Sequence, residues 1–540
     1  MMFNFRKKKN DKLKVSFGKI KDVPADFEMI EKYFRNKDNS EAFQTLSDKT
    51  CDDLDFDDLF CFLDRTNSRI GQQYLYNRLR TISSSREETL RNEEIILRFK
   101  QDEVFRVKIQ TELTQLNEFK AYYLPSLFQD EHISPPKYFF IFKLLSFISI
   151  LLLVLLPFYP QIVIALIVVF VINLGIHFWN KKNLFKYLQS IPQLLRLNHI
   201  AASIHKDSQL SKINPDLIQS IKIINQVRNR MLFFQLEGKL QGDLAVIFWS
   251  TFELVKTFFL LEPILLFGVL KRLNTKRKEI EDVFAYVGEV DMLISVASLR
   301  NGCDTFCIPE IGNKETKIVA KEIYHPLIQN CVTNTISVVN KSVLLTGSNM
   351  SGKTTFIRSI GLNLITGLTI NTCFAKAIML PMIRIYSAIR ISDDLLNNKS
   401  YYFEEVLTIK EMLEKSRNGK PSLFLLDEIF KGTNTVERIA GGKATLSYLS
   451  KNDNLVFVST HDIELGDMLV DEFELYHFSE IIDEKSLHFD FKLKEGKLKN
   501  RNALKILEIN DYPESVIREA NEISKELDKH VEKVRSSLLD

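Results

Sequence analysis

The chain has 540 residues, of which 45% are hydrophobic and 26% are charged, and its formal net charge at pH 7 is +3. This length suffices for about two to four domains with their own cores. The composition excludes a disordered or collagen-like chain, and the small net charge does not by itself indicate a nucleic-acid partner.

Residues 1–46 are predicted to form a polar, basic N-terminal segment. Lysines and arginines cluster between Arg6 and Lys14, and no apolar stretch typical of a secretory signal follows them. A solvated tail is the simplest interpretation, and attraction to anionic lipid or DNA is an open alternative.

Residues 47–136 are predicted to form the first part of a helical core. Apolar side chains recur there mostly at spacings of three and four residues, which places them on one face of a helix. They are Leu59, Phe62, Leu63, Ile70, Tyr74, Leu75 and Leu79.

An uncharged stretch then runs from Leu144 to Asn180. The sequence PFYP at 157–160 interrupts it, because proline breaks a helix. Each half holds about 18 residues and, at 1.5 Å per residue, is about as long as the hydrocarbon core of a bilayer is thick.

This stretch predicts a transmembrane helical hairpin over 137–181, with the membrane contact at 138–179. Tyr138 and Trp179 lie at its outer ends, where aromatic anchors are common, and lysines flank both ends. By the positive-inside rule both ends face the cytoplasm. The alternative is a buried hairpin in a soluble helical core.

Residues 182–306 are predicted to complete the helical core. Within them, 244–270 is apolar but is interrupted by Glu253, Lys256 and Glu262, and charges inside a bilayer are costly. We therefore predict a core helix over 244–270, with a further membrane-associated segment as the open alternative.

From 307 to 497, strand-like and helical runs alternate, which is typical of an α/β domain. The segment SVLLTGSNMSGKTTFIRSIG at 342–361 combines an apolar strand, the pattern G-x-x-x-x-G-K-T and a helix. Glycines at such positions let backbone N–H groups close around phosphates, the lysine neutralises phosphate charge, and the threonine hydroxyl binds Mg²⁺. The predicted nucleotide-binding residues are Gly347, Ser348, Asn349, Met350, Ser351, Gly352, Lys353, Thr354 and Thr355.

Two further apolar strands end in polar residues. LFLLDE leads to Asp427 and Glu428, and NLVFVSTHD leads to His461. We predict that Asp427 binds Mg²⁺ together with Thr354, and that Glu428 polarises the attacking water. His461 is predicted to contact the γ-phosphate, although a histidine after a strand is more often structural.

These three elements together resemble the ATPase domain of the MutS family, within the wider ABC-type superfamily. TGSNMSGKTT is similar to the family's T-G-P-N-M-G-G-K-S-T, and DEIFKGTNT to its D-E-[LI]-G-R-G-T-S-T. ISDDLLNNKSYYFEEV at 391–406 resembles another segment of that domain, and this similarity singles out Asp394, Ser400 and Glu405.

The resemblance extends beyond the ATPase domain. Residues 59–80 resemble the start of the family's helical core, 284–299 its lever helix, and 500–523 its C-terminal dimerisation helices. The implied fold is multidomain, α and α/β: a helical core and lever interrupted by the hairpin, then an ABC-type P-loop ATPase domain, then a dimerisation segment over 498–540.

The resemblance also implies ligands and partners. It implies ATP and Mg²⁺, bound in a homodimer with composite sites, in which Thr433, Asn434 and Thr435 of one chain face the nucleotide of the other. Asn434 stands in place of the signature serine, and Cys331 and Val332 lie where relatives stack an aromatic ring on adenine, which leaves the base selectivity open.

The predicted function is a dimeric, ATP-hydrolysing protein anchored in the cytoplasmic membrane, with both termini and the ATPase domain in the cytoplasm. The family's mismatch-reading domain and DNA clamp have no counterpart in the sequence, so mismatch recognition is not expected and DNA binding is left open. The alternative is a membrane mechanochemical or scaffolding ATPase that does not bind DNA.

Overall fold

The computed structural model describes residues 2–83, 86–131, 135–235, 243–312, 316–390, 401–483, 486–498, 503–510, 512–524 and 526. The chain forms two compact units. The helical unit comprises Met1–Glu41, Cys61–Arg80 and Ser85–Cys303, and the sheet unit comprises Ala42–Phe60, Thr81–Ser84 and Asp304–Asp540. The predicted combination of helical and α/β parts is confirmed.

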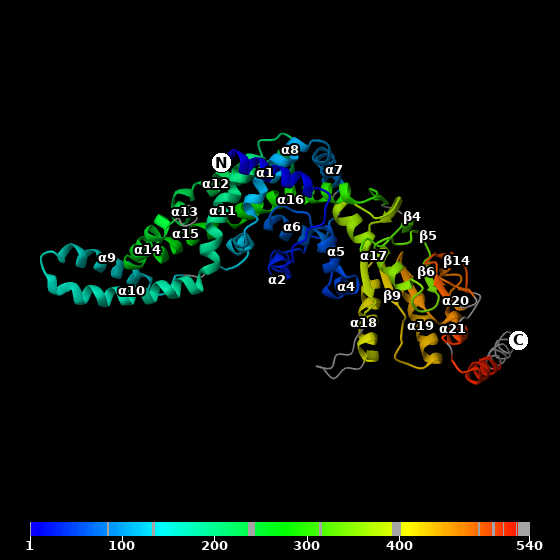
Figure 1. The fold of residues 1–540 in the computed structure, drawn as a ribbon. Coiled ribbons are helices and arrows are strands. Elements are labelled where there is room, and N and C mark those ends of the chain that lie inside the picture. The colour runs from blue at the N-terminus through cyan, green and yellow to red at the C-terminus, as the bar shows by residue number, and fades with distance from the viewer. Residues whose placement is uncertain are drawn as a thin grey trace. The chain divides into compact units, whose positions relative to one another are not determined.

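The helical unit is centred on the long helix α16 (Arg277–Gly302), which contains the predicted helix over 284–299 (Figure 1). Almost all of its second half is buried, because it packs against α6, α7, α11 and α12. The helices around it are α1 (Met2–Ser16), α2 (Phe27–Ile30), α3 (Lys32–Arg35), α6 (Arg69–Arg80), α7 (Arg86–Gln101), α8 (Glu103–Leu113), α11 (Phe185–Ile204), α12 (Leu217–Asn225) and α13 (Arg228–Gln235).

A buried carboxylate fixes α6 against α16. Asp291 accepts hydrogen bonds from the backbone N–H groups of Asn67 and Ser68, both at 2.8 Å, just before α6 begins. Burial raises the pKa of Asp291. The two helices also approach closely at Gly288, where a Cβ atom would lie 2.6 Å from the Cβ of Tyr74. These contacts hold α6 and the residues just before it against α16, although the contacting residues lie more than 200 residues apart in sequence.

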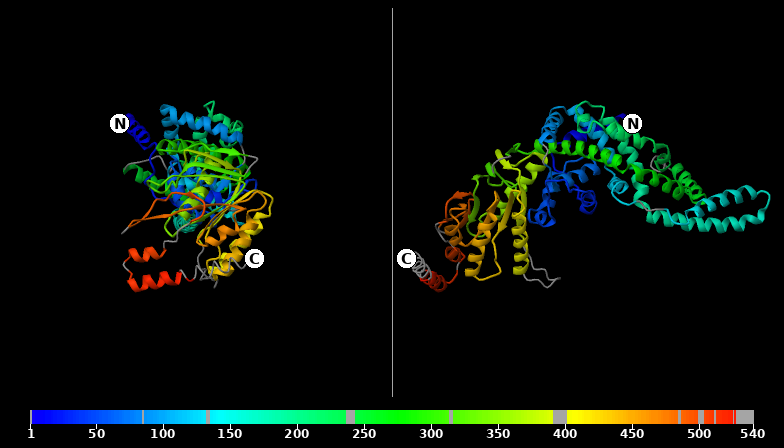
Figure 2. Two further views of the ribbon diagram at one scale, coloured as in Figure 1. Left: turned by 90° about the vertical axis from the view of Figure 1, so that its right-hand side faces the viewer. Right: turned by 180° about the vertical axis from the view of Figure 1, so that it is seen from behind.

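Two apolar helices form an antiparallel pair in the helical unit (Figures 1 and 2). They are α9 (Phe139–Leu155) and α10 (Val163–Asn183), joined through the short 3₁₀ turn Pro160–Ile162. Among the described residues, one helix, Pro160–Asn183, is long and apolar enough to cross a membrane, with a mean hydropathy of 2.6. Of the two predicted spans, only the one that contains α10 is long enough among the described residues. The other, α9, has 17 residues and ends at Leu155, just before Pro157, because proline breaks a helix.

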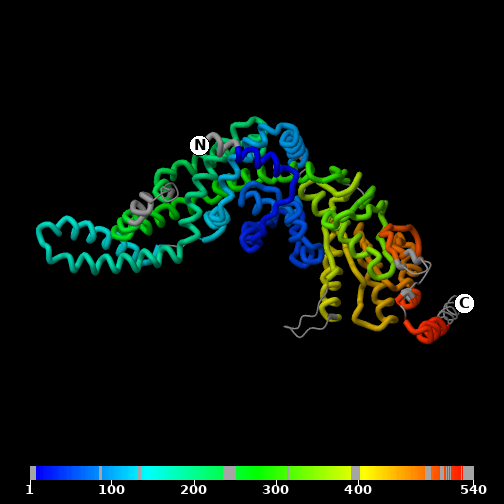
Figure 3. Tube along the Cα trace, viewed as in Figure 1, coloured from blue at the N-terminus to red at the C-terminus, as the bar shows by residue number. Residues whose placement is uncertain are grey.

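The segment predicted as a single core helix over 244–270 is instead broken into two. These are α14 (Asp243–Phe258) and α15 (Leu261–Leu273), and the chain reverses at Leu260, whose φ is 49°. After α10 the chain continues directly into α11, as the trace in Figure 3 shows. The helices α9, α10, α14 and α15 contact one another in this part of the helical unit.

The sheet unit is built on a six-stranded sheet with the order β14-β11-β6-β10-β9-β8. Five of the strands are parallel, and β14 (Lys494–Glu495) pairs antiparallel with the edge of β11. β6, β9 and β10 are apolar and buried along their length, as expected for central strands of a parallel sheet. The parallel strands are β6 (Ser342–Thr346), β8 (Arg384–Ala388), β9 (Ser422–Asp427), β10 (Leu455–Thr460) and β11 (Phe473–His477).

Further elements complete the sheet unit. A four-stranded sheet has the order β3-β7-β4-β5, and two-stranded sheets pair β1 with β2 and β12 with β13. These strands are β1 (Gln44–Thr45), β2 (Thr81–Ile82), β3 (Glu310–Gly312), β4 (Lys317–Ile323), β5 (Asn334–Val339), β7 (Ala377–Pro381), β12 (Glu480–Asp483) and β13 (Ser486–Phe489). The helices are α4 (Asp48–Asp53), α17 (Lys353–Ile370), α18 (Tyr401–Ser416), α19 (Thr435–Leu449), α20 (Ile463–Met468) and α21 (Ala503–Ile509), and α5 (Phe56–Leu63) carries the chain between the units.

Residues 42–60 belong to the sheet unit by their contacts, although they lie far from it in sequence. The buried Asp53 accepts hydrogen bonds from the backbone N–H of Ile389 at 3.1 Å and of Arg390 at 2.7 Å, at the end of β8. The amide of Gln44 pairs with the backbone of Ile385 in the middle of β8. These residues therefore complete the free edge of the six-stranded sheet.

Candidate functional site

A glycine loop, residues 347–352, joins β6 to α17. Gly347 and Gly352 have φ values of 147° and 107°, which residues other than glycine rarely adopt. A Cβ atom at Gly347 would also lie 2.6 Å from the carbonyl oxygen of Phe478. No described side chain caps the start of α17. The loop therefore leaves the first N–H groups of this helix available to an anion.

Lys353 is the first residue of α17 and lies folded back over the glycine loop. Its Nζ donates hydrogen bonds to the carbonyl oxygens of Gly347 and Ser348, both at 2.8 Å. The side chain is almost completely buried, and this burial lowers the pKa of Lys353. The ammonium thus sits inside the loop, where a phosphate group would meet it.

Thr354, the second residue of α17, meets Asp427 at the carboxyl end of β9. The hydroxyl of Thr354 donates to Oδ2 of Asp427 at 2.8 Å, and the hydroxyl of Ser459 donates to Oδ1 of the same carboxylate. Hydroxyl and carboxylate oxygens are the ligand types that Mg²⁺ prefers. The two residues predicted to bind the metal are therefore adjacent, and they suit this ion.

Glu428 and His461 form a pair beside the glycine loop. Nε2 of His461 lies 2.9 Å from Oε1 of Glu428 and 2.8 Å from Oδ1 of Asn349, and Nζ of Lys431 lies 3.2 Å from Oε2 of Glu428. The hydrogen bond with His461, together with the charge of Lys431, lowers the pKa of Glu428 to about 2. Glu428 is therefore ionised at neutral pH.

The segment 430–435 leads from Glu428 into α19. The backbone N–H of Phe430 donates to the buried Glu405, which α18 brings beneath the segment. Asn434 caps α19, because its Oδ1 accepts from the backbone N–H of Glu437 at 3.0 Å. Its amide and the Thr433 hydroxyl both donate to the Glu437 carboxylate, at 2.5 and 3.0 Å.

The residues predicted to reach a partner's nucleotide are thus not joined to the glycine loop by these hydrogen bonds. Asn434 and Thr435 are exposed at the start of α19, and Val436 beside them is 78% exposed. Asp394 and Ser400 lie outside the described residues, so Glu405 is the described member of that predicted group.

A cavity of about 330 Å³ adjoins the glycine loop. Cys331 and Val332, which the resemblance places where relatives stack a ring on adenine, line it together with Gly352 and the aromatic residues Tyr324, Phe478 and Phe491. A Cβ at Gly352 would lie 3.3 Å from the ring of Phe491, so this ring lies over the loop. Sequence reasoning missed Phe491, and the available signal was the aromatic run HFDF at 488–491 that follows the last parallel strand.

A buried histidine beside this cavity predicts an acid-sensitive sheet unit. Burial, with the nearby charge of Arg358, lowers the pKa of His325 to about 4. Between pH 6.5 and 4, His325 takes up a proton in the unfolded chain but stays neutral in the folded chain. The free energy of unfolding therefore falls as the pH falls, by up to about 3 kcal/mol.

This loss is measurable by denaturant unfolding of the full chain at pH 7 and pH 4.5. His325→Asn should lose less stability than the unmodified chain over this interval, and His199→Asn, at an exposed position, should behave like the unmodified chain. Equal losses in all three chains would contradict the role of His325.

Comparison with known proteins places these features in one family. Residues 343–528 match the family model described as MutS domain V. The chain is 30% identical over 254 residues to the DNA mismatch repair protein MutS of Aquifex pyrophilus, covering 45% of the chain and 29% of that protein. It is 27% identical over 277 residues to the DNA mismatch repair protein MSH3 of Saccharomyces cerevisiae (strain YJM789), covering 48% and 27%. The chain thus matches under a third of the length of these relatives.

Proposed function

The chain belongs to the MutS family, and on this basis we propose that it binds and hydrolyses ATP with Mg²⁺ at the glycine loop. The observation that carries the proposal is the meeting of Lys353 and the uncapped start of α17 with Asp427, Glu428 and His461. These groups come from three neighbouring parallel strands and combine phosphate-binding, metal-binding and water-activating chemistry.

In the proposed binding step, the phosphates of ATP enter the glycine loop. The ammonium of Lys353 exchanges its two carbonyl partners, Gly347 and Ser348, for phosphate oxygens. The hydroxyl of Thr354 and the carboxylate of Asp427 would hold Mg²⁺, which would supply positive charge to the phosphates. The adenine base enters the 330 Å³ cavity and stacks on Phe491.

In the proposed hydrolysis step, the carboxylate of Glu428 accepts a proton from the water that attacks the γ-phosphorus. The bond to the ADP oxygen breaks, and inorganic phosphate and ADP leave. A carboxylate with a pKa of about 2 is a weak base. We therefore propose that the γ-phosphate draws His461 and Lys431 away from Glu428, which raises its basicity only when substrate is bound.

We further propose that two copies of the chain share each site. The start of α19 presents the exposed Asn434 and Thr435 and a helix N-terminus, and these suit a γ-phosphate offered by a second copy. ATP would then hold two sheet units together and hydrolysis would release them. Sedimentation with and without a non-hydrolysable ATP analogue measures this, and a chain that stays monomeric with the analogue would exclude a shared site.

We propose that the hairpin α9–α10 anchors the chain in the cytoplasmic membrane, with the sheet unit in the cytoplasm. The support is the row of exposed apolar side chains along both helices, which water would solvate poorly. The chain should stay with the membrane fraction after a carbonate wash. Recovery of the intact chain in the soluble fraction would contradict the anchor.

DNA is the second candidate partner, because the matched relatives are named DNA mismatch repair proteins. The ATP hydrolysis rate should be compared with duplex DNA, with branched DNA and with liposomes. Stimulation by DNA, with retardation in a low-salt gel shift, would favour ATP-dependent DNA binding. Stimulation by liposomes alone would favour a membrane mechanochemical or scaffolding ATPase.

A further inference from the structure

A network of charged and polar side chains lies where α10, α14 and α15 meet, with Lys256 and Glu262 buried and Glu253 35% exposed. Lys256 is 0% exposed, and its Nζ lies 3.1 Å from Oε1 of Glu253 and 3.1 Å from Oε2 of Glu262. The amide of Asn180 donates to Oε1 of Glu262 at 3.1 Å. The ammonium of Lys256 therefore lies between the two carboxylates, and the partly exposed Lys181 also pairs with Oε1 of Glu253, at 2.7 Å.

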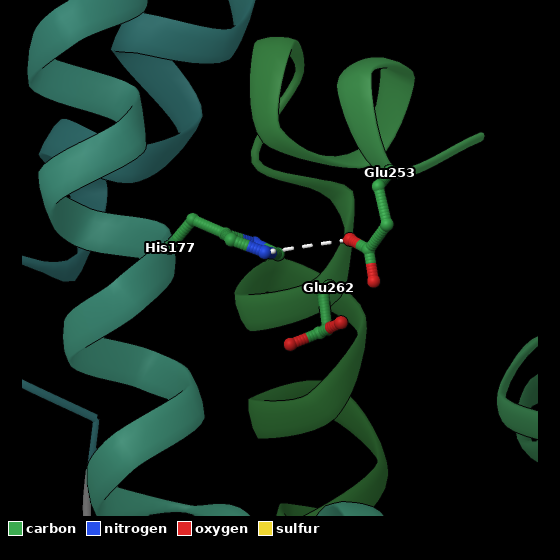
Figure 4. Close-up of side chains that lie close together, drawn as sticks. All are labelled: His177, Glu253 and Glu262. Carbon is green, nitrogen blue, oxygen red and sulfur yellow. Dashed lines mark ion pairs between the residues drawn. The ribbon is translucent and has the colours of Figure 1, made fainter. Parts of the chain in front are cut away.

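The buried His177 extends this network from α10. Its Nε2 lies 3.4 Å from Oε2 of Glu253, and Figure 4 shows its ring pointing from α10 toward Glu253, with Glu262 beside them. We call His177, Asn180, Glu253, Lys256 and Glu262 the ionic cluster. Its members come from three helices and face one another.

The outer surface of the same helices is apolar. On α10, Ile164 is 74% exposed, and on α14 Leu254 is 57% exposed. Other exposed members of this surface are Phe140, Phe147 and Val154 on α9, Val168, Val171 and Phe178 on α10, and Val255 on α14. The charged groups of Lys256 and Glu262 thus face inward while large apolar groups face outward, which is the reverse of the arrangement that water favours.

At the break between α14 and α15, a side chain of α10 donates a hydrogen bond to a backbone carbonyl at the end of α14. Asn173 of α10 is completely buried, and its Nδ2 donates to the backbone carbonyl of Phe258 at 2.7 Å and to Oγ of Ser149 at 3.1 Å. Phe258 ends α14, and its ring stacks on Phe170 with centroids 6.0 Å apart. A free carbonyl at a helix end is tolerated in water, but in lipid it needs an internal partner.

An apolar groove runs between the two pairs of helices. It has a volume of about 430 Å³, and Leu153 of α9, Ile167 and Phe170 of α10, and Leu254 and Phe258 of α14 line it. The apolar surface is therefore continuous from α9 and α10 onto α14. A phospholipid acyl chain has the chemistry that fits this surface.

From these observations we infer that α14 and α15 form a second, shorter membrane hairpin, which enters the bilayer beside α9–α10 to the level of Asn173. The ionic cluster is then the interior of a four-helix membrane bundle, where ionisable residues of membrane proteins are normally placed. This inference rests on the proposed membrane anchor and deepens it, because it gives the charged segment 244–270 a place within the bilayer.

Quenching of tryptophan fluorescence by brominated lipid tests the inference. Both native tryptophans of the full chain are first removed by Trp179→Phe and Trp249→Phe. A single tryptophan is then introduced by Leu254→Trp. The protein is reconstituted in phosphatidylcholine nanodiscs with or without bromine on the acyl chains. Ile164→Trp reports on the first hairpin, and Leu97→Trp, at an exposed position of α7, reports on the surface in water.

We expect brominated lipid to quench Leu254→Trp to the same extent as Ile164→Trp, and to leave Leu97→Trp unchanged. Loss of quenching at Leu254→Trp alone would overturn the second hairpin and leave the anchor standing. An absence of quenching at both Leu254→Trp and Ile164→Trp would overturn the anchor itself.

Discussion

Replacement of Lys353 by alanine should lower the ATP hydrolysis rate by about 100- to 1,000-fold, the effect of removing one preorganised charge donor from a reacting group. The ammonium lies inside the glycine loop, held by two carbonyl oxygens at 2.8 Å, and no other described lysine has this position. The Cβ methyl group of alanine cannot reach a phosphate. ATP binding should weaken as well, because the loop loses its positive charge.

A steady-state phosphate-release assay measures this loss. Lys376→Ala is the matched control, because Lys376 is an exposed lysine of the sheet unit that pairs with Glu322 at 3.1 Å, away from the loop. Its rate should equal that of the unmodified chain, and circular dichroism should show that both variants fold. Unchanged turnover in Lys353→Ala would show that the glycine loop is not the site of hydrolysis.

Replacement of Glu428 by glutamine should abolish hydrolysis while leaving ATP bound. Loss of a general base lowers rates by about 100- to 10,000-fold, and glutamine keeps the shape of the side chain. Lys353, Thr354 and Asp427 remain in place, so the nucleotide still has its phosphate and metal contacts. The variant should therefore accumulate in the ATP-bound form.

Single-turnover hydrolysis and filter binding of labelled ATP separate these two effects. Glu411→Gln, on the exposed side of α18, controls for the loss of one carboxylate. Hydrolysis at the normal rate in Glu428→Gln would assign the base to another residue. Loss of ATP binding together with hydrolysis would show that Glu428 serves the structure of the loop.

The sequence predicted the local geometry of the glycine loop well, because strand, loop and helix are consecutive there. β6 ends at Thr346 and α17 begins at Lys353, as the pattern indicated. The meeting of Asp427 and His461 with this loop followed from parallel strands that end at one edge of a sheet. The exposed position of Asn434 at the start of α19 is likewise compatible with its predicted role.

Other contacts could not be predicted, because they join residues far apart in sequence. Nothing near Asp53 indicates that it binds the backbone at the end of β8, and nothing near Phe491 indicates that its ring covers Gly352. In the sequence, the charged residues within 244–270 indicated that this segment does not contact lipid. The structure turns Lys256 and Glu262 inward, so composition alone could not show which surface they occupy.

A mixing experiment tests most directly the proposal that ATP is hydrolysed in sites shared by two copies of the chain. Lys353→Ala removes the charge within the loop, and Thr435→Glu places a carboxylate at the start of α19, where it repels a partner's γ-phosphate but suits the free helix. Thr435→Ser, which keeps the hydroxyl, is the control.

Each variant alone should be inactive. Mixed in equal amounts, they should recover about a quarter of the normal rate, because about half of the dimers are then mixed and each mixed dimer has one complete site. If the mixture stays inactive, or if Thr435→Glu alone hydrolyses ATP at the normal rate, the sites are not shared.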